Sequence, residues 1–109
     1  MMEEIKFKKI EGGCVVFVTG EIDLSNSHEL RKTILAALKT NQKVYVDLSQ
    51  VSYIDSSGIA SLVEGLQFSK SKGREFFLSK TSQQVKSIME LARLDQVFTI
   101  LDETPETAE

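Results

Sequence analysis

The chain has 109 residues, of which 41% are hydrophobic and 27% are charged, and its formal net charge is −3. A chain of this length and composition fits one globular domain, and its acidic balance disfavours nucleic acid as the main partner, because phosphate binding needs a basic patch. The sequence shows no long apolar run, no secretory-signal pattern and no second cysteine beside Cys14, which predicts a cytoplasmic protein without membrane insertion or an internal disulfide.

Strand and helix patterns alternate along the chain. Strands are predicted at residues 5–10, 14–19, 44–48, 75–78 and 97–101, with a turn at 11–13 between the first two. Helices are predicted to start after the N-cap candidates at residues 25–27, 55–57 and 81–82. The order ββαβαβαβ predicts an α/β fold, in which a mixed β-sheet is opened by a hairpin and helices pack over it. We expect residues 1–102 to form this single domain and residues 103–109 to be a flexible acidic tail.

The junction between the central strand and the second helix concentrates polar side chains. After the strand at residues 44–48, a short polar crossing leads to Tyr53 and Ile54, and then to Asp55, Ser56 and Ser57. The helical spacing of apolar residues begins directly afterwards. Because ligands and partners dock at the carboxyl ends of the strands in α/β proteins, this junction is the candidate site.

Three kinds of chemistry find little support in the sequence. A serine nucleophile needs a general base, and the one histidine, His28, is expected to be an exposed helix residue. Asp23, Asp47 and Asp55 match no metal-binding loop, and Asp47 is expected to lie inside its strand. The junction also lacks the glycine-rich loop with a lysine that cradles phosphates. We therefore predict no enzymatic activity, no metal and no cofactor.

Two interpretations of the junction remain open on physical grounds. Asp55, Ser56 and Ser57 could serve only to cap the helix. Alternatively, the Ser56 hydroxyl accepts a phosphate, which adds about −1.5 to −2 charges and which a helix N-terminus tolerates through its free N–H groups. A docked partner would then meet extra charge beside Asp55 and, if the loops converge, beside Asp23. Phosphorylation would in that case act as a binding switch.

Three segments of the sequence resemble one protein family. Residues 44–63, with Asp55, Ser56, Ser57 and Gly58, are similar to the signature of the STAS domain family, and specifically of the bacterial anti-sigma factor antagonists. Residues 18–23 are similar to the family's Thr-Gly-Glu-x-Asp motif, and residues 87–98 resemble its last helix and the turn into the final strand. The three matches occur in order and cover nearly the whole chain.

The resemblance implies a regulatory function and gives each motif residue a role. In that family the unphosphorylated antagonist binds an anti-sigma factor that is also a GHKL-type serine kinase, and so frees a sigma factor. Phosphorylation releases the antagonist, and a serine phosphatase reverses the modification. By motif position, the phosphoacceptor is Ser56, Asp55 helps to present it, Ser57 with Gly58 begins the helix, and Asp23 lies on the neighbouring loop near the partner. The alternative is an accessory subunit of a lipid-transport ABC complex.

Two further expectations concern the surface. Charged residues on the first strand protect the edge of the hairpin, which predicts a monomer or a weak dimer. These residues are Lys6, Lys8 and Lys9. Polar residues of the second helix are expected to lie on its exposed face and to border the partner. They are Ser61, Glu64 and Ser69.

Overall fold

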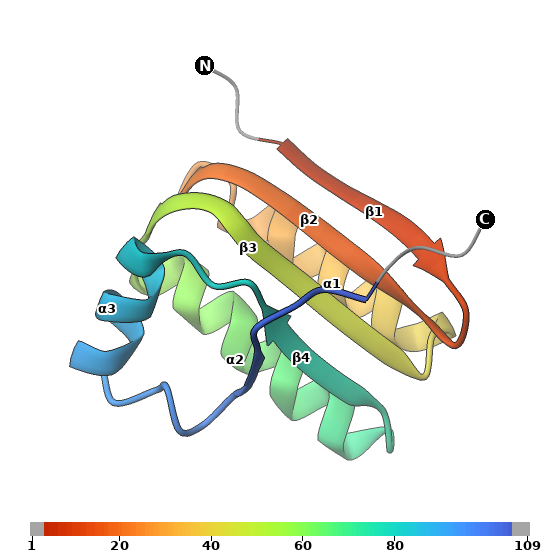
Figure 1. Cartoon of the computed structure of the whole chain (residues 1–109). Helices are drawn as coiled ribbons and strands as arrows, with labels where there is room; N and C mark the ends of the chain where they lie inside the picture. Colours follow the sequence, from red (N-terminus) through yellow and green to blue (C-terminus); the bar gives the residue numbers. More distant parts are fainter. Residues whose placement is uncertain (1–3, 106–109) are drawn as a thin grey trace.

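The computed structural model describes residues 4–105, and within them it confirms the predicted order of five strands and three helices (Figure 1). The elements are β1 (Glu4–Ile10), β2 (Gly13–Ile22), α1 (Ser27–Thr40), β3 (Lys43–Ile54), α2 (Ser56–Ser71), β4 (Glu75–Ser79), α3 (Gln83–Leu91) and β5 (Thr99–Leu101). The strands form one mixed sheet in the order β1-β2-β3-β4-β5. β1 runs antiparallel to β2, and all the other neighbouring strands are parallel.

Strand β3 is longer than the sequence pattern predicts. The predicted strand ended at residue 48, followed by a polar crossing, but β3 continues without a break to Ile54. Two register shifts in the pairing with β2 accommodate the polar residues, so that Gln50 pairs with Thr19 and Tyr53 with Glu21. As a result β2 and β3 end together, at the paired residues Ile22 and Ile54.

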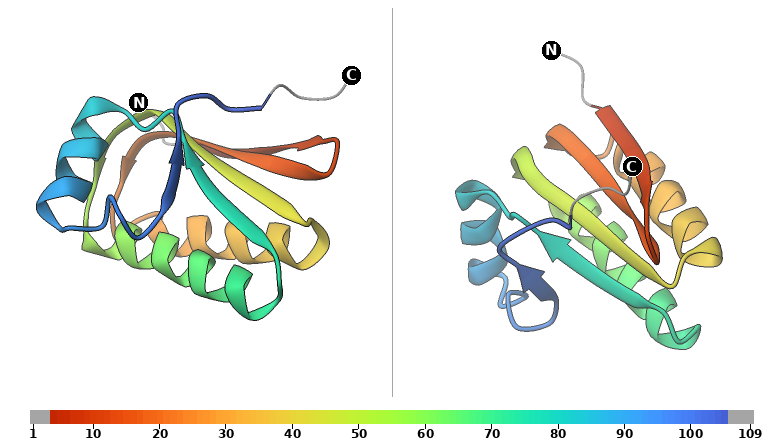
Figure 2. Two further views of the ribbon diagram at one scale, coloured as in Figure 1. Left: turned by 60° about the horizontal axis from the view of Figure 1, so that its bottom comes forward. Right: turned by 45° about the vertical axis from the view of Figure 1, so that its right-hand side comes forward.

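Helices α1 and α2 cover one face of the sheet, and the C-terminal segment crosses the other face (Figure 2). Because successive strand residues point to opposite faces, every second residue of β3 contributes to the core beneath the sheet. These residues include Val44, Val46 and Leu48, all fully buried. Helix α3 lies beside the carboxyl half of β3, where the Ser82 hydroxyl donates to the carbonyl of Val51 at 2.6 Å. No helix within residues 4–105 is long and apolar enough to cross a membrane.

The helix boundaries follow local hydrogen bonding. Ser82 caps α3 as predicted, since its hydroxyl accepts a hydrogen bond from the Val85 N–H at 3.3 Å. Thr81 does not share this role, and its hydroxyl is buried without a hydrogen-bond partner among the described residues. Helix α1 begins after Asn26, whose side chain makes no cap hydrogen bond because it serves the preceding loop instead.

A buried carboxylate holds the chain after β5 against the sheet. Asp47 lies inside β3, as predicted, and is 5% exposed. Its Oδ2 atom accepts a hydrogen bond from the Thr104 hydroxyl at 2.7 Å, and that hydroxyl lies 2.7 Å from the Ser79 hydroxyl. The predicted flexible tail spans residues 103–109, and its last four residues lie outside the described part of the chain.

Candidate functional site

The common end of β2 and β3 brings two loops together. The Asp55 N–H donates to the carbonyl of Ile22 at 3.0 Å, which fixes the start of α2 against the end of β2. The loop that begins with Asp23 therefore lies beside the junction of β3 and α2, although the two are some thirty positions apart in sequence. The structure thus brings Asp23 into the neighbourhood of Asp55, Ser56, Ser57 and Gly58, as the resemblance implied.

Asp55 is the N-cap of α2. Its Oδ1 atom accepts hydrogen bonds from the Ser57 N–H at 2.9 Å, the Ser57 hydroxyl at 2.6 Å and the Gly58 N–H at 3.1 Å. The Ser57 hydroxyl is the largest cause of a lowered pKa for this carboxyl, followed by the Gly58 N–H. The backbone of Leu24 contributes a smaller effect in the same direction. Asp55 is therefore ionised at neutral pH and caps the first turn of α2.

The two serines of the motif have different surroundings. Ser57 is half-buried, and its hydroxyl is engaged by Asp55. Ser56 is the first residue of α2 and is exposed, and its hydroxyl makes no side-chain hydrogen bond to another described residue. Ser56 is thus the accessible hydroxyl of the junction, next to a carboxylate and at the positive end of a helix dipole.

The loop between β2 and α1 is held by its own side chains. Asp23 Oδ1 accepts hydrogen bonds from the N–H of Ser25 at 2.9 Å and from its hydroxyl at 2.5 Å. The Asn26 side chain accepts from the Asp23 N–H at 2.9 Å and donates to the Glu21 carbonyl at 2.8 Å. These bonds explain why Asn26 is not available as a side-chain cap, and they give the loop one defined conformation.

Comparison with known proteins identifies the family. The model of the STAS domain matches residues 4–108. The chain belongs to the STAS domain family. It is 24% identical over 96 residues to the anti-sigma-B factor antagonist of Bacillus subtilis, covering 88% of each chain. It is 26% identical over 86 residues to the protein of the same name from Listeria monocytogenes, covering 78% of this chain and 75% of the other.

A solved structure shares the STAS fold of this chain. The anti-sigma factor antagonist of Mycobacterium paratuberculosis superimposes with a TM-score of 0.83 at 23% identity, covering 94% of this chain and 87% of the other. At that identity the likeness supports the fold, including the mixed sheet with helices packed over it.

One side chain at the junction of this STAS domain carries no signal in the sequence pattern. Leu24 lies in the loop after β2, and 81% of it is exposed. Tyr53, near the end of β3, is 47% exposed. From its residue type alone, a leucine next to the end of a strand is expected to be buried in the core. Only the conformation of the loop shows that Leu24 is exposed to solvent.

The expectation for the polar face of α2 was wrong at two of its three residues. Ser61 and Ser69 are buried, because α2 packs against both the sheet and α1. The Ser61 hydroxyl donates to the carbonyls of Ser27 at 2.9 Å and Ser57 at 3.1 Å, and the Ser69 hydroxyl donates to the Leu66 carbonyl at 2.6 Å. These serines satisfy backbone groups between packed helices, which hydrophobic periodicity does not reveal.

Glu64 is the residue of this group that reaches the surface. Its carboxylate accepts a hydrogen bond from Arg31 of α1 at 2.7 Å, and both side chains are partly exposed. An exposed ion pair of this kind adds little to the stability of a fold, because solvent screens the two charges, so it joins the two helices only weakly.

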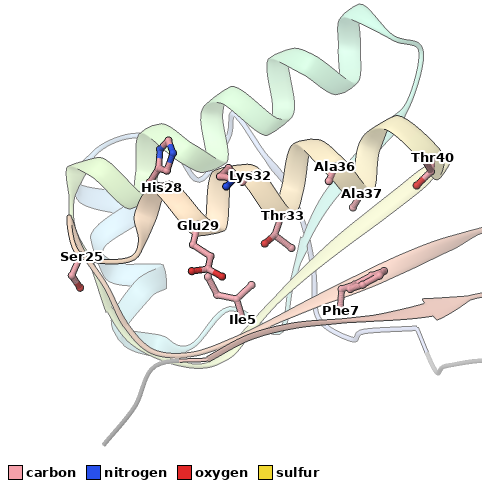
Figure 3. A pocket seen from close by; sticks show the side chains of 10 residues that line it. All are labelled: Ile5, Phe7, Ser25, His28, Glu29, Lys32, Thr33, Ala36, Ala37 and Thr40. Atoms are coloured by element: carbon pink, nitrogen blue, oxygen red, sulfur yellow. The ribbon is translucent and has the colours of Figure 1, made fainter.

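The STAS domain also has a cavity away from the junction, between β1 and α1 (Figure 3). Its volume is about 740 Å³, and it lies along one face of α1 opposite Ile5 and Phe7 of the edge strand. The exposed His28 lines it together with Ser25 at one end, but none of residues 55–58 does. The cavity is therefore separate from the junction.

We expect replacement of Asp55 with alanine to lower the free energy of unfolding, because the helix loses its N-cap. Asp55→Asn keeps an acceptor oxygen and loses the charge, so it is expected to cost less. The lowered pKa means that the ionised carboxyl stabilises the fold above its unfolded pKa of about 3.9, and that this contribution is lost as the pH falls through the folded pKa.

Urea denaturation of both variants at several pH values checks this prediction. The stability difference between the wild-type protein and Asp55→Asn is expected at pH 7 and should shrink at acidic pH. A difference that stays constant down to pH 2 would show that the charge of Asp55 has no part in it.

Proposed function

We propose that this protein is an anti-sigma factor antagonist controlled by phosphorylation of Ser56. The unphosphorylated form binds an anti-sigma factor that is also a GHKL-type serine kinase, and binding frees a sigma factor. Phosphorylation of Ser56 releases the antagonist, and a serine phosphatase restores it. The observation that carries the proposal is the exposed Ser56 hydroxyl at the start of α2, next to the ionised Asp55.

The surroundings of Ser56 suit a reversible phosphate. The helix N-terminus favours a negative group electrostatically, so the modification need not disturb the fold. A phosphate adds about −1.5 to −2 charges directly beside the Asp55 carboxylate, and the Asp23 loop adds another carboxylate to the same edge. A partner that fits this edge in the unphosphorylated state then meets a large negative charge, which disfavours binding without a conformational change in the antagonist.

Each motif residue has a role in this proposal. Asp55 fixes the first turn of α2 and so presents Ser56, while Ser57 and Gly58 supply the hydrogen-bonded start of the helix. Asp23 shapes the neighbouring loop and contributes to the partner surface. The protein itself acts as a non-catalytic regulator in the cytoplasm. The names of its relatives support this class of function.

The test is a pull-down from the native host with the wild-type protein and with Ser56→Ala, followed by mass spectrometry of residue 56. We expect both baits to recover a GHKL-type kinase, and we expect ATP to release the wild-type bait only, with phosphate on Ser56. Ser57→Ala is the matched control and should be released like the wild type. Recovery of an ABC ATPase and a permease in place of a kinase would contradict the proposal and support a lipid-transport subunit.

A further inference from the structure

Leu24 is an apolar side chain held out from the edge at which the proposed switch lies. It is 81% exposed, in a chain whose other aliphatic residues beside β2 and β3, such as Ile22 and Ile54, are buried. It is flanked by acidic residues, with the exposed Glu21 before it and Asp23 next to it. A single exposed leucine needs no explanation in general. This one lies at the edge that carries Ser56, on a loop that is closed by its own hydrogen bonds.

The backbone around Leu24 is fixed on both sides. Asp23 and Asn26 form the hydrogen bonds that close the loop, and the Asn26 and Ser27 N–H groups both donate to the Asp23 carbonyl, at 3.1 and 2.8 Å. On the other side, the Ile22 carbonyl, two residues before Leu24, accepts a hydrogen bond from the Asp55 N–H at 3.0 Å. The side chain therefore starts from a backbone that is already ordered, and little conformational entropy is lost when a partner covers it.

The bond between the Asp55 N–H and the Ile22 carbonyl also places the loop of Leu24 beside the junction. Asp55 precedes Ser56 directly, and its carboxylate holds the first turn that presents Ser56. A partner that contacts the Ser56 hydroxyl therefore meets the edge on which the loop of Leu24 lies.

We infer that Leu24 is the apolar anchor by which the antagonist binds its anti-sigma factor. This inference rests on the proposed function and names the contact that supplies affinity. The partner surface that fits is an apolar pocket, because Leu24 is an exposed aliphatic side chain on the loop beside Ser56. Affinity in such an interface is concentrated in a central anchor that neighbouring contacts shield from water.

The division of roles explains how one phosphate can switch the complex. Leu24 gives an attraction that does not depend on the charge of Ser56. Phosphorylation of Ser56 introduces bulk and charge at the same edge, so that the partner can no longer close around Leu24. The switch then acts by blocking an existing contact and needs no movement of the loop.

The chain offers a matched control for this inference. Leu91, at the end of α3, is also a leucine and is 87% exposed, but it lies on an element that takes no part in the junction (Figure 1). Replacement of either leucine with alanine deletes the same set of exposed side-chain atoms and leaves the core unchanged. Any difference between the two variants in binding therefore reports the position of the side chain.

The experiment measures the dissociation constant of the purified anti-sigma factor recovered above, by calorimetry, for the wild-type protein and for Leu24→Ala, Leu24→Met, Leu91→Ala and Ser56→Asp. We expect Leu24→Ala to weaken binding at least tenfold. Leu24→Met should stay within about threefold of the wild type, because methionine conserves apolar volume. Leu91→Ala should also stay within about threefold, because Leu91 lies outside the junction. Thermal unfolding of the Leu24 variants should match the wild type, since the side chain is exposed.

The outcomes distinguish the proposed phosphorylation switch at Ser56 from the proposed anchor at Leu24. If Leu24→Ala binds like the wild type while Ser56→Asp binds weakly, the proposed switch holds and the anchor is refuted. If Leu24→Ala and Leu91→Ala weaken binding equally, the anchor is also refuted, because the effect is not specific to the junction. If the wild-type protein binds no anti-sigma factor, the proposed function fails, and the inference that rests on it fails with it.

Discussion

Replacement of Ser56 with aspartate is expected to weaken binding of the anti-sigma factor at least tenfold, which corresponds to about 1.4 kcal/mol. The new carboxylate would stand next to Asp55, whose own charge is maintained by hydrogen bonds from Ser57 and Gly58. Two adjacent negative charges cannot both be matched by a partner surface that fits one of them, and an unmatched charge at an interface is costly. A phosphate carries more charge than aspartate, so phosphorylated protein should bind more weakly still.

The matched control is Ser56→Asn, which has nearly the same size as aspartate but no charge. We expect Ser56→Asn to retain most of the affinity, and we expect the defect of Ser56→Asp to shrink as salt is added, because the repulsion between partly exposed charges is screened. Calorimetric titrations at two salt concentrations distinguish the explanations. Equal losses for Asn and Asp, independent of salt, would mean that steric bulk and not charge controls release.

Phosphorylation of Ser56 in the wild-type protein tests whether the switch is local. Residues 20–30 and 50–65 contain the loop and the junction, and we expect changes in amide chemical shift on phosphorylation to be confined to them. The rigid support of this edge, with Asp55 bonded to both segments, gives the fold no reason to rearrange elsewhere. Large shifts in β1 or along the C-terminal half of α2 would instead indicate an allosteric change.

Hydrophobic periodicity was sufficient to predict most of the fold. Alternation in the strands and the spacing of apolar residues in the helices gave the order of elements, because these patterns directly reflect which faces are buried. The pattern failed in the second half of β3, where the polar residues Gln50 and Ser52 remain in the strand through register shifts with β2. A bulge depends on pairing with another strand, and a local pattern cannot show it.

Only part of the candidate site could be predicted, because a local sequence pattern shows only interactions between residues that are close in the sequence. Asp55 as an N-cap follows from local sequence, and the structure confirms it. The choice between Ser56 and Ser57 needed the family resemblance, and the structure adds a physical difference, because Asp55 engages only the Ser57 hydroxyl. Leu24 had no signal at all, since its exposure follows from a loop conformation that depends on Asp23, Asn26 and the distant Asp55, whose N–H bonds to Ile22.

Replacement of Gly58 with alanine is expected to destabilise the protein by about 1–3 kcal/mol, the usual cost of overfilling a core. The first turn of α2 lies directly on the ends of β2 and β3. A Cβ atom at Gly58 would come within 2.6 Å of Ile22 Cγ2 and also within 2.6 Å of Ile54 Cγ1. Both isoleucines are fully packed, and their branched side chains are stiff, so neither can turn away without moving the strand ends.

Helix propensity opposes this effect and has to be measured separately. Alanine is favoured over glycine inside a helix by about 1 kcal/mol, so without the overlap Gly58→Ala would stabilise the protein. Ala60, two residues later and exposed, provides the control, because Ala60→Gly reports the propensity term in the same turn of α2. Urea denaturation of both variants separates the cost of the steric overlap at Gly58 from the gain in helix propensity. A Gly58→Ala variant that is more stable than the wild type would show that the strand ends yield freely.

In Gly58→Ala, the overlap of the new side chain with the strand ends would also displace the first turn of α2, which carries Ser56. Relief of the contact with Ile22 and Ile54 requires the first turn of α2 to lift from the sheet, and the Asp55 N–H would then lose its bond to the Ile22 carbonyl. Asp55 is bonded through its N–H to the strand end before the loop of Leu24 and through its carboxylate to the turn of Ser56, so both parts of the proposed partner surface would move together. We therefore expect Gly58→Ala to weaken anti-sigma factor binding even at temperatures where the variant is fully folded, whereas Ala60→Gly should leave binding unchanged.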